Sequence, residues 1–362
     1  MVTGALGSLG VGAAAVFGVQ AATTPTTVVG QASPAQSASA PAGFIPAYRP
    51  GTSFGGTSSA TGATTSASAA QQVGIVEINT VLQYRNAEAA GTGMVLTSDG
   101  EILTNNHVVD GATSISVTIS STGATYTATV VGTDPTDDVA VLQLSDASGL
   151  QTAKLSSAAA SVGESVTGVG NAGGTGTLTA ATGTVTALDQ SITASDETGG
   201  KSEQLTGLIE IDAAIQAGDS GGPLYGDDGR IIGMDTAASS GGPADAYAIP
   251  IDTARAIADQ IESGADTTTI HHGNPAFLGV SMADGATGAT VAGVLSGGAA
   301  ESAGITAGDV ITSIDGTSIA SAADLSSAMA GHNPGDRVTV TWTTATGASE
   351  SATVTLGTGP AD

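Results

Sequence analysis

IEIDAAIQAGDSGGPL, at residues 209–224, is the most informative segment of this sequence, because a strand-like run leads into a glycine-rich turn around one serine. Glycines allow a turn tight enough to expose the hydroxyl of Ser220. The backbone N–H groups of Gly218 and Ser220 are placed to stabilise the oxyanion that forms when the hydroxyl attacks a carbonyl carbon. The segment therefore predicts an acyl-transfer nucleophile, Ser220, with an oxyanion hole beside it.

A serine nucleophile needs a base, and histidine is the usual one because its pKa lies near neutrality. The chain has four histidines. His107 follows the strand-like Ile102-Leu103-Thr104, whereas His271 and His272 lie in a polar segment and His332 lies near the C-terminus. We predict His107 as the base because it alone lies in the same strand-rich region as Ser220.

The base in turn needs a carboxylate that orients the imidazole and stabilises its charged form. Asp138 stands directly before the apolar run Val139-Ala140-Val141-Leu142, at the edge of a predicted core. Asp137 is the neighbouring alternative. Asp138 is the preferred candidate, and the chain order His, Asp, Ser differs from the order Ser, Asp, His of α/β-hydrolases.

Around these residues the pattern is mainly β. Short runs of Val, Ile and Thr recur between Gly, Asp and Asn turns from residue 73 to about 251, which indicates a sandwich or a pair of barrels. An amphipathic helix is predicted at residues 251–261, where it would close this first domain. A polar linker follows at 263–275, and a second strand-rich block begins at 276.

The composition narrows the possible partners. The formal net charge is -26, from 33 acidic and 7 basic residues, which repels nucleic-acid phosphates and anionic lipid head groups. The chain has no cysteine, so disulfides, thiolate metal sites and cysteine nucleophiles are excluded. An excess of carboxylates favours solubility in an external medium.

The N-terminal region reads as an export segment followed by a linker. Residues 4–22 are uncharged and apolar, and their number is near the minimum for a membrane span. We expect residues 1–22 to be an export segment, either a signal that is cleaved or an anchor that is retained. Residues 23–72 are rich in Ser, Thr, Ala and Pro, and we expect a disordered linker there.

These motifs resemble the HtrA family of trypsin-like proteases: TNNHVV around His107, DDVAVLQL from Asp137 and AIQAGDSGGPL around Ser220. The segments IGMDTAAS, AFLG and HNPGD resemble the actinobacterial PepA type of this family. The resemblance implies a chymotrypsin-like double β-barrel at 73–262 and a PDZ domain at 276–358. It also implies cleavage of unfolded proteins outside the cytoplasm without a cofactor, and assembly into homotrimers.

Two positions need separate comment under this resemblance. Asp219 stands where many HtrA proteases have Asn before the nucleophile. In activated chymotrypsin-like proteases an Asp at this place pairs with a newly exposed N-terminal amine, but no activation-cleavage motif precedes Val73, so Asp219 is expected to be solvated or paired elsewhere. Ala214 and Ile215 correspond to the base of the primary specificity pocket, which predicts a preference for small or medium apolar side chains over Lys and Arg.

In the second block, Phe277-Leu278-Gly279-Val280 resembles the carboxylate-binding loop of a PDZ domain. A helix predicted at about 322–329 would form the other wall of a groove for peptide C-termini.

Three further interpretations are disfavoured. Residues 168–173 fit G-x-G-x-x-G, but no helix follows, as a dinucleotide site requires. His271 and His272 are adjacent and lack further ligands, so no metal site is predicted. An esterase would use the same triad, but the alternation of strands and helices is lacking. A latent protease fold that only binds peptides stays open as the main alternative.

Overall fold

The structure is a computed structural model that describes residues 64–82, 87–195, 202–238, 246–264, 267–283 and 288–361. The predicted export segment lies outside these residues, as does the predicted linker up to residue 63. No helix in the described ranges has the length and apolar character needed to span a membrane. Strands dominate, so the prediction of a mainly β protein is confirmed.

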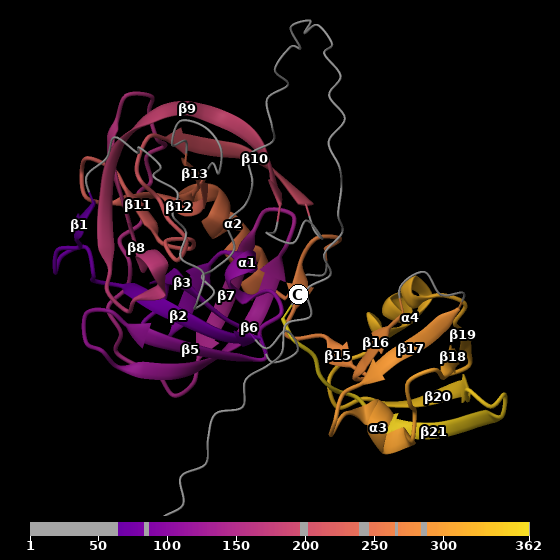
Figure 1. Cartoon of the computed structure of the whole chain (residues 1–362). Coiled ribbons are helices and arrows are strands. Elements are labelled where there is room, and N and C mark those ends of the chain that lie inside the picture. The colour runs from indigo at the N-terminus through magenta and orange to yellow at the C-terminus, as the bar shows by residue number, and fades with distance from the viewer. Residues whose placement is uncertain are drawn as a thin grey trace, which may run out of the picture. The chain divides into compact units, whose positions relative to one another are not determined.

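The first sheet closes into a barrel. Its strands are β2 (Ile75–Leu82), β3 (Ala87–Val95), β4 (Glu101–Thr104), β5 (Ser114–Ile119), β6 (Thr125–Asp134), β7 (Val139–Leu144) and β14 (His271–His272). They follow the order β14-β6-β5-β2-β3-β4-β7, and an additional pairing of β6 with β7 closes the ring (Figure 1). In β2, buried Ile78, Thr80 and Leu82 alternate with less buried residues, as expected for a strand with one face in a core.

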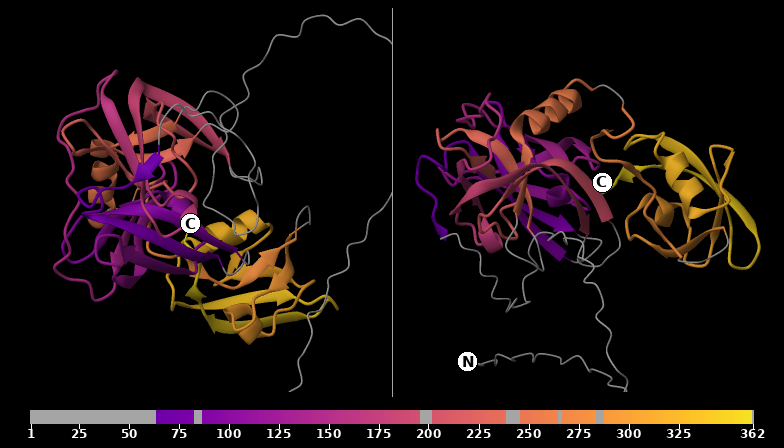
Figure 2. Two further views of the ribbon diagram at one scale, coloured as in Figure 1. Left: turned by 60° about the vertical axis from the view of Figure 1, so that its left-hand side comes forward. Right: turned by 90° about the horizontal axis from the view of Figure 1, so that it is seen from above.

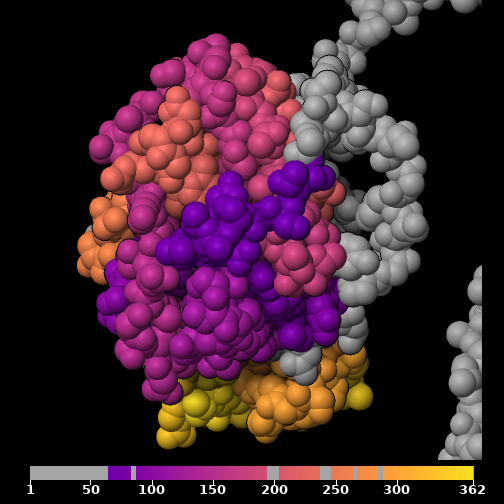
Figure 3. Space-filling view, turned by 90° about the vertical axis from the view of Figure 1, so that its left-hand side faces the viewer, coloured from indigo at the N-terminus to yellow at the C-terminus, as the bar shows by residue number. Residues whose placement is uncertain are grey.

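The second sheet also closes. It contains β1 (Thr64–Ser66), β8 (Ser165–Gly170), β9 (Thr179–Ser195), β10 (Ser202–Ile211), β11 (Pro223–Tyr225), β12 (Ile231–Ala238) and β13 (Ala246–Pro250). The order is β1-β9-β10-β13-β12-β11-β8, and β9 also pairs with β8. Figure 3 shows the indigo segment that begins at Thr64 against this barrel, in agreement with the antiparallel pairing of β1 and β9.

The helix α2 (Ile251–Glu262) holds the two barrels together. It contacts β6 and β7 of the first barrel and β12 and β13 of the second (Figure 2). Ile257 and Ile261, one turn apart, are both buried in a core that also contains Val139, Val141 and Met234. The loops that carry the candidate residues are therefore fixed on a rigid scaffold.

The C-terminal block, taken by itself, is a small α+β domain. One sheet has the order β16-β17-β18-β20-β21, with β19 paired to β18, and a separate two-stranded sheet joins β15 to β22. The helices are α3 (Ala299–Ala303) and α4 (Ala322–Met329). The strands are β15 (Ala276–Phe277), β16 (Val280–Met282), β17 (Ala289–Val294), β18 (Val310–Ile314), β19 (Thr317–Ser318), β20 (Arg337–Thr343), β21 (Ser349–Thr355) and β22 (Gly357–Thr358).

Candidate active site

His107 is positioned by a short helix after β4. The helix α1 (Asn106–Val109) begins shortly after the end of β4. The buried side chains of Val108 and Val109 anchor it in the hydrophobic core of the first barrel. The same core contains Ile102 of β4. Apolar residues on both sides of His107 thus fix the backbone that carries the imidazole.

Asp138 lies against His107 and is completely buried. Nδ1 of the imidazole is 3.0 Å from Oδ1 and 2.9 Å from Oδ2 of the carboxylate. The backbone N–H of His107 donates to Oδ1 at 3.0 Å, and Asn105 Nδ2 donates to the carbonyl oxygen of Asp138 at 2.9 Å. Asp138 has φ 55°, a left-handed conformation directly before β7. Of the two sequence candidates, Asp138 pairs with the imidazole, while the N–H of Asp137 donates to Asp134.

Thr236 of β12 connects Asp138 to Ser220. Its hydroxyl donates to Oδ2 of Asp138 at 2.5 Å, and its carbonyl oxygen accepts a hydrogen bond from Oγ of Ser220 at 3.2 Å. A chain of hydrogen bonds therefore runs from the serine through Thr236 to the carboxylate that holds His107. The sequence did not identify Thr236, because a threonine in a strand-like run carries no local signal of this contact.

The turn around Ser220 contains two backbone N–H groups that are candidates for an oxyanion hole. Gly218 has φ 95°, and a Cβ there would overlap the carbonyl oxygen of Asn171. In the described part of the chain, neither the N–H of Gly218 nor that of Ser220 donates to another protein group. Both N–H groups are thus available to a ligand oxygen, as an oxyanion hole requires.

Thr92 of β3 ties this turn to the first barrel. Its hydroxyl donates to the carbonyl oxygen of Gly218 at 2.7 Å and accepts from the N–H of Asn171 at 2.9 Å. Its backbone N–H donates to the carbonyl oxygen of Ser220 at 2.9 Å. Thr104 Oγ1 donates to the carbonyl oxygen of Thr92 at 2.7 Å. Thr92 is a second positioning residue that sequence reasoning missed.

Two buried carboxyl groups lie on one face of β8. An ideal Cβ at Gly170 would lie 2.6 Å from Oδ1 of Asp219, and one at Gly168 would lie 2.8 Å from Oδ2 of Asp235. Residues 168 and 170 are two apart in a strand and therefore share a face. The glycines of the G-x-G motif thus leave room for two aspartates.

Burial raises the pKa of Asp219 to about 7, although the N–H of Gln216 donates to its Oδ2 at 2.9 Å. Burial, and then the charge of Asp219, raise the pKa of Asp235 well above its ordinary value. Asp219 is 3% exposed, so the expectation of a solvated side chain is wrong. Its partner is the backbone of its own turn.

The other sequence-predicted residues lie as follows. Ala214 is half-buried and Ile215 is buried, with its Cδ1 against Gly168 near Asp235. After β8 the chain forms a short 3-10 turn, Ala172–Gly174. His271 and His272 form β14 and pair with Thr133 and Gly132 at the edge of the first sheet. No cluster of metal-ligating side chains occurs among the described residues.

In the C-terminal block, the predicted loop Phe277–Val280 runs from β15 into β16. Phe277 pairs with Gly357, Leu278 is buried, and Gly279 has φ 83°. The carbonyl oxygens of Leu278 and Gly279 accept from Ala300 and Leu295. The predicted helix at 322–329 is α4.

Comparison with known proteins bears on both blocks. The family of trypsin-like peptidase domains matches residues 91–234, and the family of PDZ domains matches residues 276–356. Solved structures that match include the HtrA-type protease AlgW with a decapeptide, at 25% identity and a TM-score of 0.45 over 81% of this chain and 99% of that one.

Relatives with curated names include serine protease PepD of Mycobacterium tuberculosis, 34% identical over 78% of this chain and 63% of the relative. The periplasmic pH-dependent serine endoprotease DegQ of Escherichia coli is 36% identical over 69% of this chain and 56% of the relative. The chain thus spans less than two thirds of the length of either relative. By its two matched domains and these named relatives, the chain belongs to the HtrA-like family, in which a trypsin-like peptidase domain of two β-barrels is followed by a PDZ domain.

Proposed function

We propose that this chain is a serine endopeptidase that hydrolyses peptide bonds of unfolded or misfolded proteins outside the cytoplasm. The observation that carries the proposal is the pairing of His107 with the buried carboxylate of Asp138, which also accepts a hydrogen bond from Thr236. The extracytoplasmic site of action is supported by relatives named as periplasmic proteases. We further propose that the chain is of the actinobacterial PepA type and that it assembles into homotrimers.

The first chemical step is activation of the nucleophile. Because Asp138 contacts Nδ1 of His107, the imidazole donates its Nδ1–H to the carboxylate and keeps Nε2 as the proton acceptor. Oγ of Ser220 exchanges its bond to Thr236 for one to Nε2 and attacks the substrate carbonyl carbon as its proton moves to the imidazole. Buried Asp138 stabilises the imidazolium that results.

The second step is collapse of the tetrahedral intermediate. The N–H groups of Gly218 and Ser220 hold the oxyanion, and His107 returns its proton to the leaving amine. Water then attacks the acyl-enzyme by the same base catalysis, which releases the second product.

Ala214 and Ile215 form the base of the specificity pocket and favour small or medium apolar side chains.

The PDZ domain is proposed to bind peptide C-termini. Phe277, Leu278, Gly279 and Val280 form the loop next to β16, and a bound peptide would add a strand to that edge with α4 as the other wall. A peptide with an apolar C-terminus is expected to bind, and blocking its carboxylate by amidation to abolish binding. Equal affinity for the free and amidated peptides would contradict this assignment.

The direct test is degradation of unfolded casein by the full chain and by the Ser220→Ala variant, at neutral pH without metal or ATP. Cleavage by the parent alone would support the proposal. Covalent labelling of the parent by a fluorophosphonate, absent in the variant, would show an activated serine. Neither cleavage nor labelling in the parent would sink the proposal.

One observation favours a second candidate, a latent protease fold that acts as a peptide-binding module. The hydroxyl of Ser220 donates to the carbonyl oxygen of Thr236, an arrangement in which the nucleophile is not engaged by its base. This candidate predicts no cleavage of casein with peptide binding retained at the PDZ domain. Cleavage of casein at a rate that does not change when a PDZ-binding peptide is added would exclude this second candidate.

A further inference from the structure

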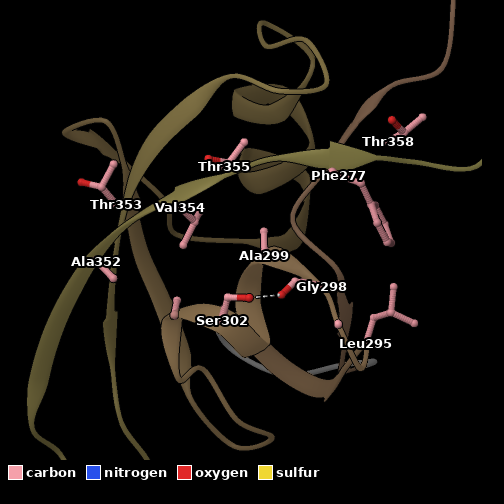
Figure 4. Close-up of a pocket in the computed structure, with 13 residues that line it drawn as sticks. Phe277, Leu295, Gly298, Ala299, Ser302, Ala352, Thr353, Val354, Thr355 and Thr358 are labelled. Atoms are coloured by element: carbon pink, nitrogen blue, oxygen red, sulfur yellow. Dashed lines mark hydrogen bonds between the residues drawn. The ribbon is translucent and has the colours of Figure 1, made fainter.

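The PDZ domain contains a groove on the side of α3 and β21, distinct from the α4 wall. Its volume is about 550 Å³. Phe277 and Leu295 lie at one end, and Ala352 and Thr353 lie at the other (Figure 4). The lining residues are Phe277, Leu295, Gly297, Gly298, Ala299, Ser302, Ala303, Ala352, Thr353, Val354, Thr355, Gly357 and Thr358.

The lining is uncharged. None of these residues is Asp, Glu, Lys, Arg or His, although the whole chain has 33 acidic and 7 basic residues. A carboxylate or ammonium group would lose its hydration there without gaining a counter-ion. The groove therefore suits an uncharged occupant.

One wall of the groove is the outer edge of β21, with which no strand pairs among the residues that the structure describes. The strand order ends at β21, whose other edge pairs with β20. Thr339 of β20 donates its N–H to Oδ1 of Asp315 at 2.6 Å and accepts from the N–H of Asp315 at 2.9 Å, so its backbone groups face away from β21. Thr353, which lies opposite Thr339, is consequently not bonded to it, and its own N–H and C=O point away from β20.

Thr355 lies two residues after Thr353 in β21, so its N–H and C=O also point away from β20. Both residues line the groove. Beyond them the pairing of Gly357 with Phe277 ends the open edge. The groove thus offers backbone donors and acceptors in the spacing that an extended peptide matches.

We propose that this groove binds an extended, uncharged internal segment of polypeptide by strand addition to β21. Backbone hydrogen bonds to Thr353 and Thr355 supply the register, and Phe277 with Leu295 receives one apolar side chain of the ligand. The occupant is an unfolded stretch of substrate, an identification that rests on the proposed function. Such a site would hold a substrate by its middle, whereas the carboxylate loop would hold its end.

The test uses the full chain with Ser220→Ala, so that the ligand is not cleaved. The probe is a fluorescein-labelled heptapeptide of alternating Val and Thr with one Phe, acetylated and amidated, and binding is followed by fluorescence anisotropy. Thr353→Pro removes an edge N–H and should weaken binding at least 10-fold. Ser351→Pro is the matched control, because Ser351 has the same parity on β21 but does not line the groove, and it should leave binding within about 3-fold.

A second measurement leaves the protein unaltered. Two further heptapeptides are N-methylated, one at its odd and one at its even residues, so that each lacks the N–H groups along one of its edges. One of these two peptides should lose binding. Hydrogen exchange should slow at the amides of Thr353 and Thr355 when the unmethylated peptide is added.

Equal binding by Thr353→Pro and Ser351→Pro, or by both methylated peptides, would overturn the proposal. So would concentration-dependent association of the chain that Thr353→Pro abolishes without any peptide binding, since the edge would then pair copies of the protein. These outcomes do not depend on hydrolysis, so they are independent of whether the proposed protease activity is found.

Discussion

Thr236 donates its hydroxyl hydrogen to Oδ2 of Asp138 at 2.5 Å, while its carbonyl oxygen receives the hydroxyl of Ser220. One residue of β12 thus contacts both ends of the candidate triad. Asp138 is completely buried, and its charge is compensated by this hydroxyl together with the imidazole and the N–H of His107. Hydrogen bonds to a buried charge are stronger than those between neutral groups.

Replacing Thr236 by Val should therefore lower kcat. The substitution keeps the shape of the side chain but removes a hydrogen bond to a buried carboxylate, a loss of about 1.5–3 kcal/mol. If that loss falls on the orientation of His107, kcat decreases about 10- to 100-fold. Thr236→Ser keeps the hydroxyl and should retain kcat within about 3-fold. Equal rates for the Val and Ser variants in a peptide-cleavage assay would show that Thr236 has no positioning role.

Thr92→Val should also lower kcat, through the oxyanion hole. The change leaves the carbonyl oxygen of Gly218 and the N–H of Asn171 buried without their partner, at a cost of about 1–3 kcal/mol for each group. Since the bond to Gly218 orients its peptide group, we expect kcat to fall more than KM rises. Thr80→Val is the control, because Thr80 is equally buried but its hydroxyl makes only a 3.4 Å bond within the β2–β3 pair. Similar losses of kcat in both variants would refute a specific role for Thr92.

Asp219 should make stability dependent on pH. Its pKa is raised from 3.8 to about 7 by burial, so the folded protein holds a proton that the unfolded chain has already released. Asp219 should therefore lower the free energy of unfolding as pH rises from about 4 to about 7, by up to about 1.4 kcal/mol per pH unit. Asp235, whose pKa burial also raises, should add to the decline in the same direction.

Asp219→Asn should remove the contribution of Asp219 and make the profile less steep, most visibly at pH 8, where the charged aspartate is most unfavourable. The slope that remains is expected to come from Asp235. Urea denaturation at pH 5, 6, 7 and 8 measures it. Asp228→Asn is the control, since that side chain is exposed. Parallel pH profiles for the parent and Asp219→Asn would show that Asp219 is ionised without cost in the folded protein.

The main elements of the site were predictable from the sequence because they depend on local patterns. Ser220 is marked by its glycine turn, and Asp138 by the apolar run that follows it. The mainly β fold follows from short runs of Val, Ile and Thr between turn residues. The helix predicted at 251–261 also follows from a local pattern, the four-residue spacing of Ile257 and Ile261, and it is present as α2.

What could not be predicted depends on contacts between distant segments. Thr92 meets Gly218 across 126 residues of sequence, and Thr236 meets Asp138 across 98. Threonines in strands are common, and nothing in their local sequence distinguishes these two. The burial of Asp219 was missed for the same reason, because the space for it is provided by Gly170 on another strand.

Gly221 gives a final test of how closely the nucleophile turn fits the first barrel. It has φ 80°, and a Cβ there would overlap Thr104 Oγ1 and the carbonyl oxygen of Thr92. Gly123 has φ 72° but nothing within 4 Å of the same position. Gly123→Ala should therefore cost only the backbone strain of a left-handed residue, about 1–2 kcal/mol, with activity unchanged. Gly221→Ala should cost more, because it must also displace the Thr92 peptide, and cleavage of a peptide substrate should fall at least 100-fold. Equal stability and equal activity in the two variants, measured by urea denaturation and by peptide hydrolysis, would mean that the turn tolerates separation from β3, and that its position does not depend on the contacts with Thr92 and Thr104.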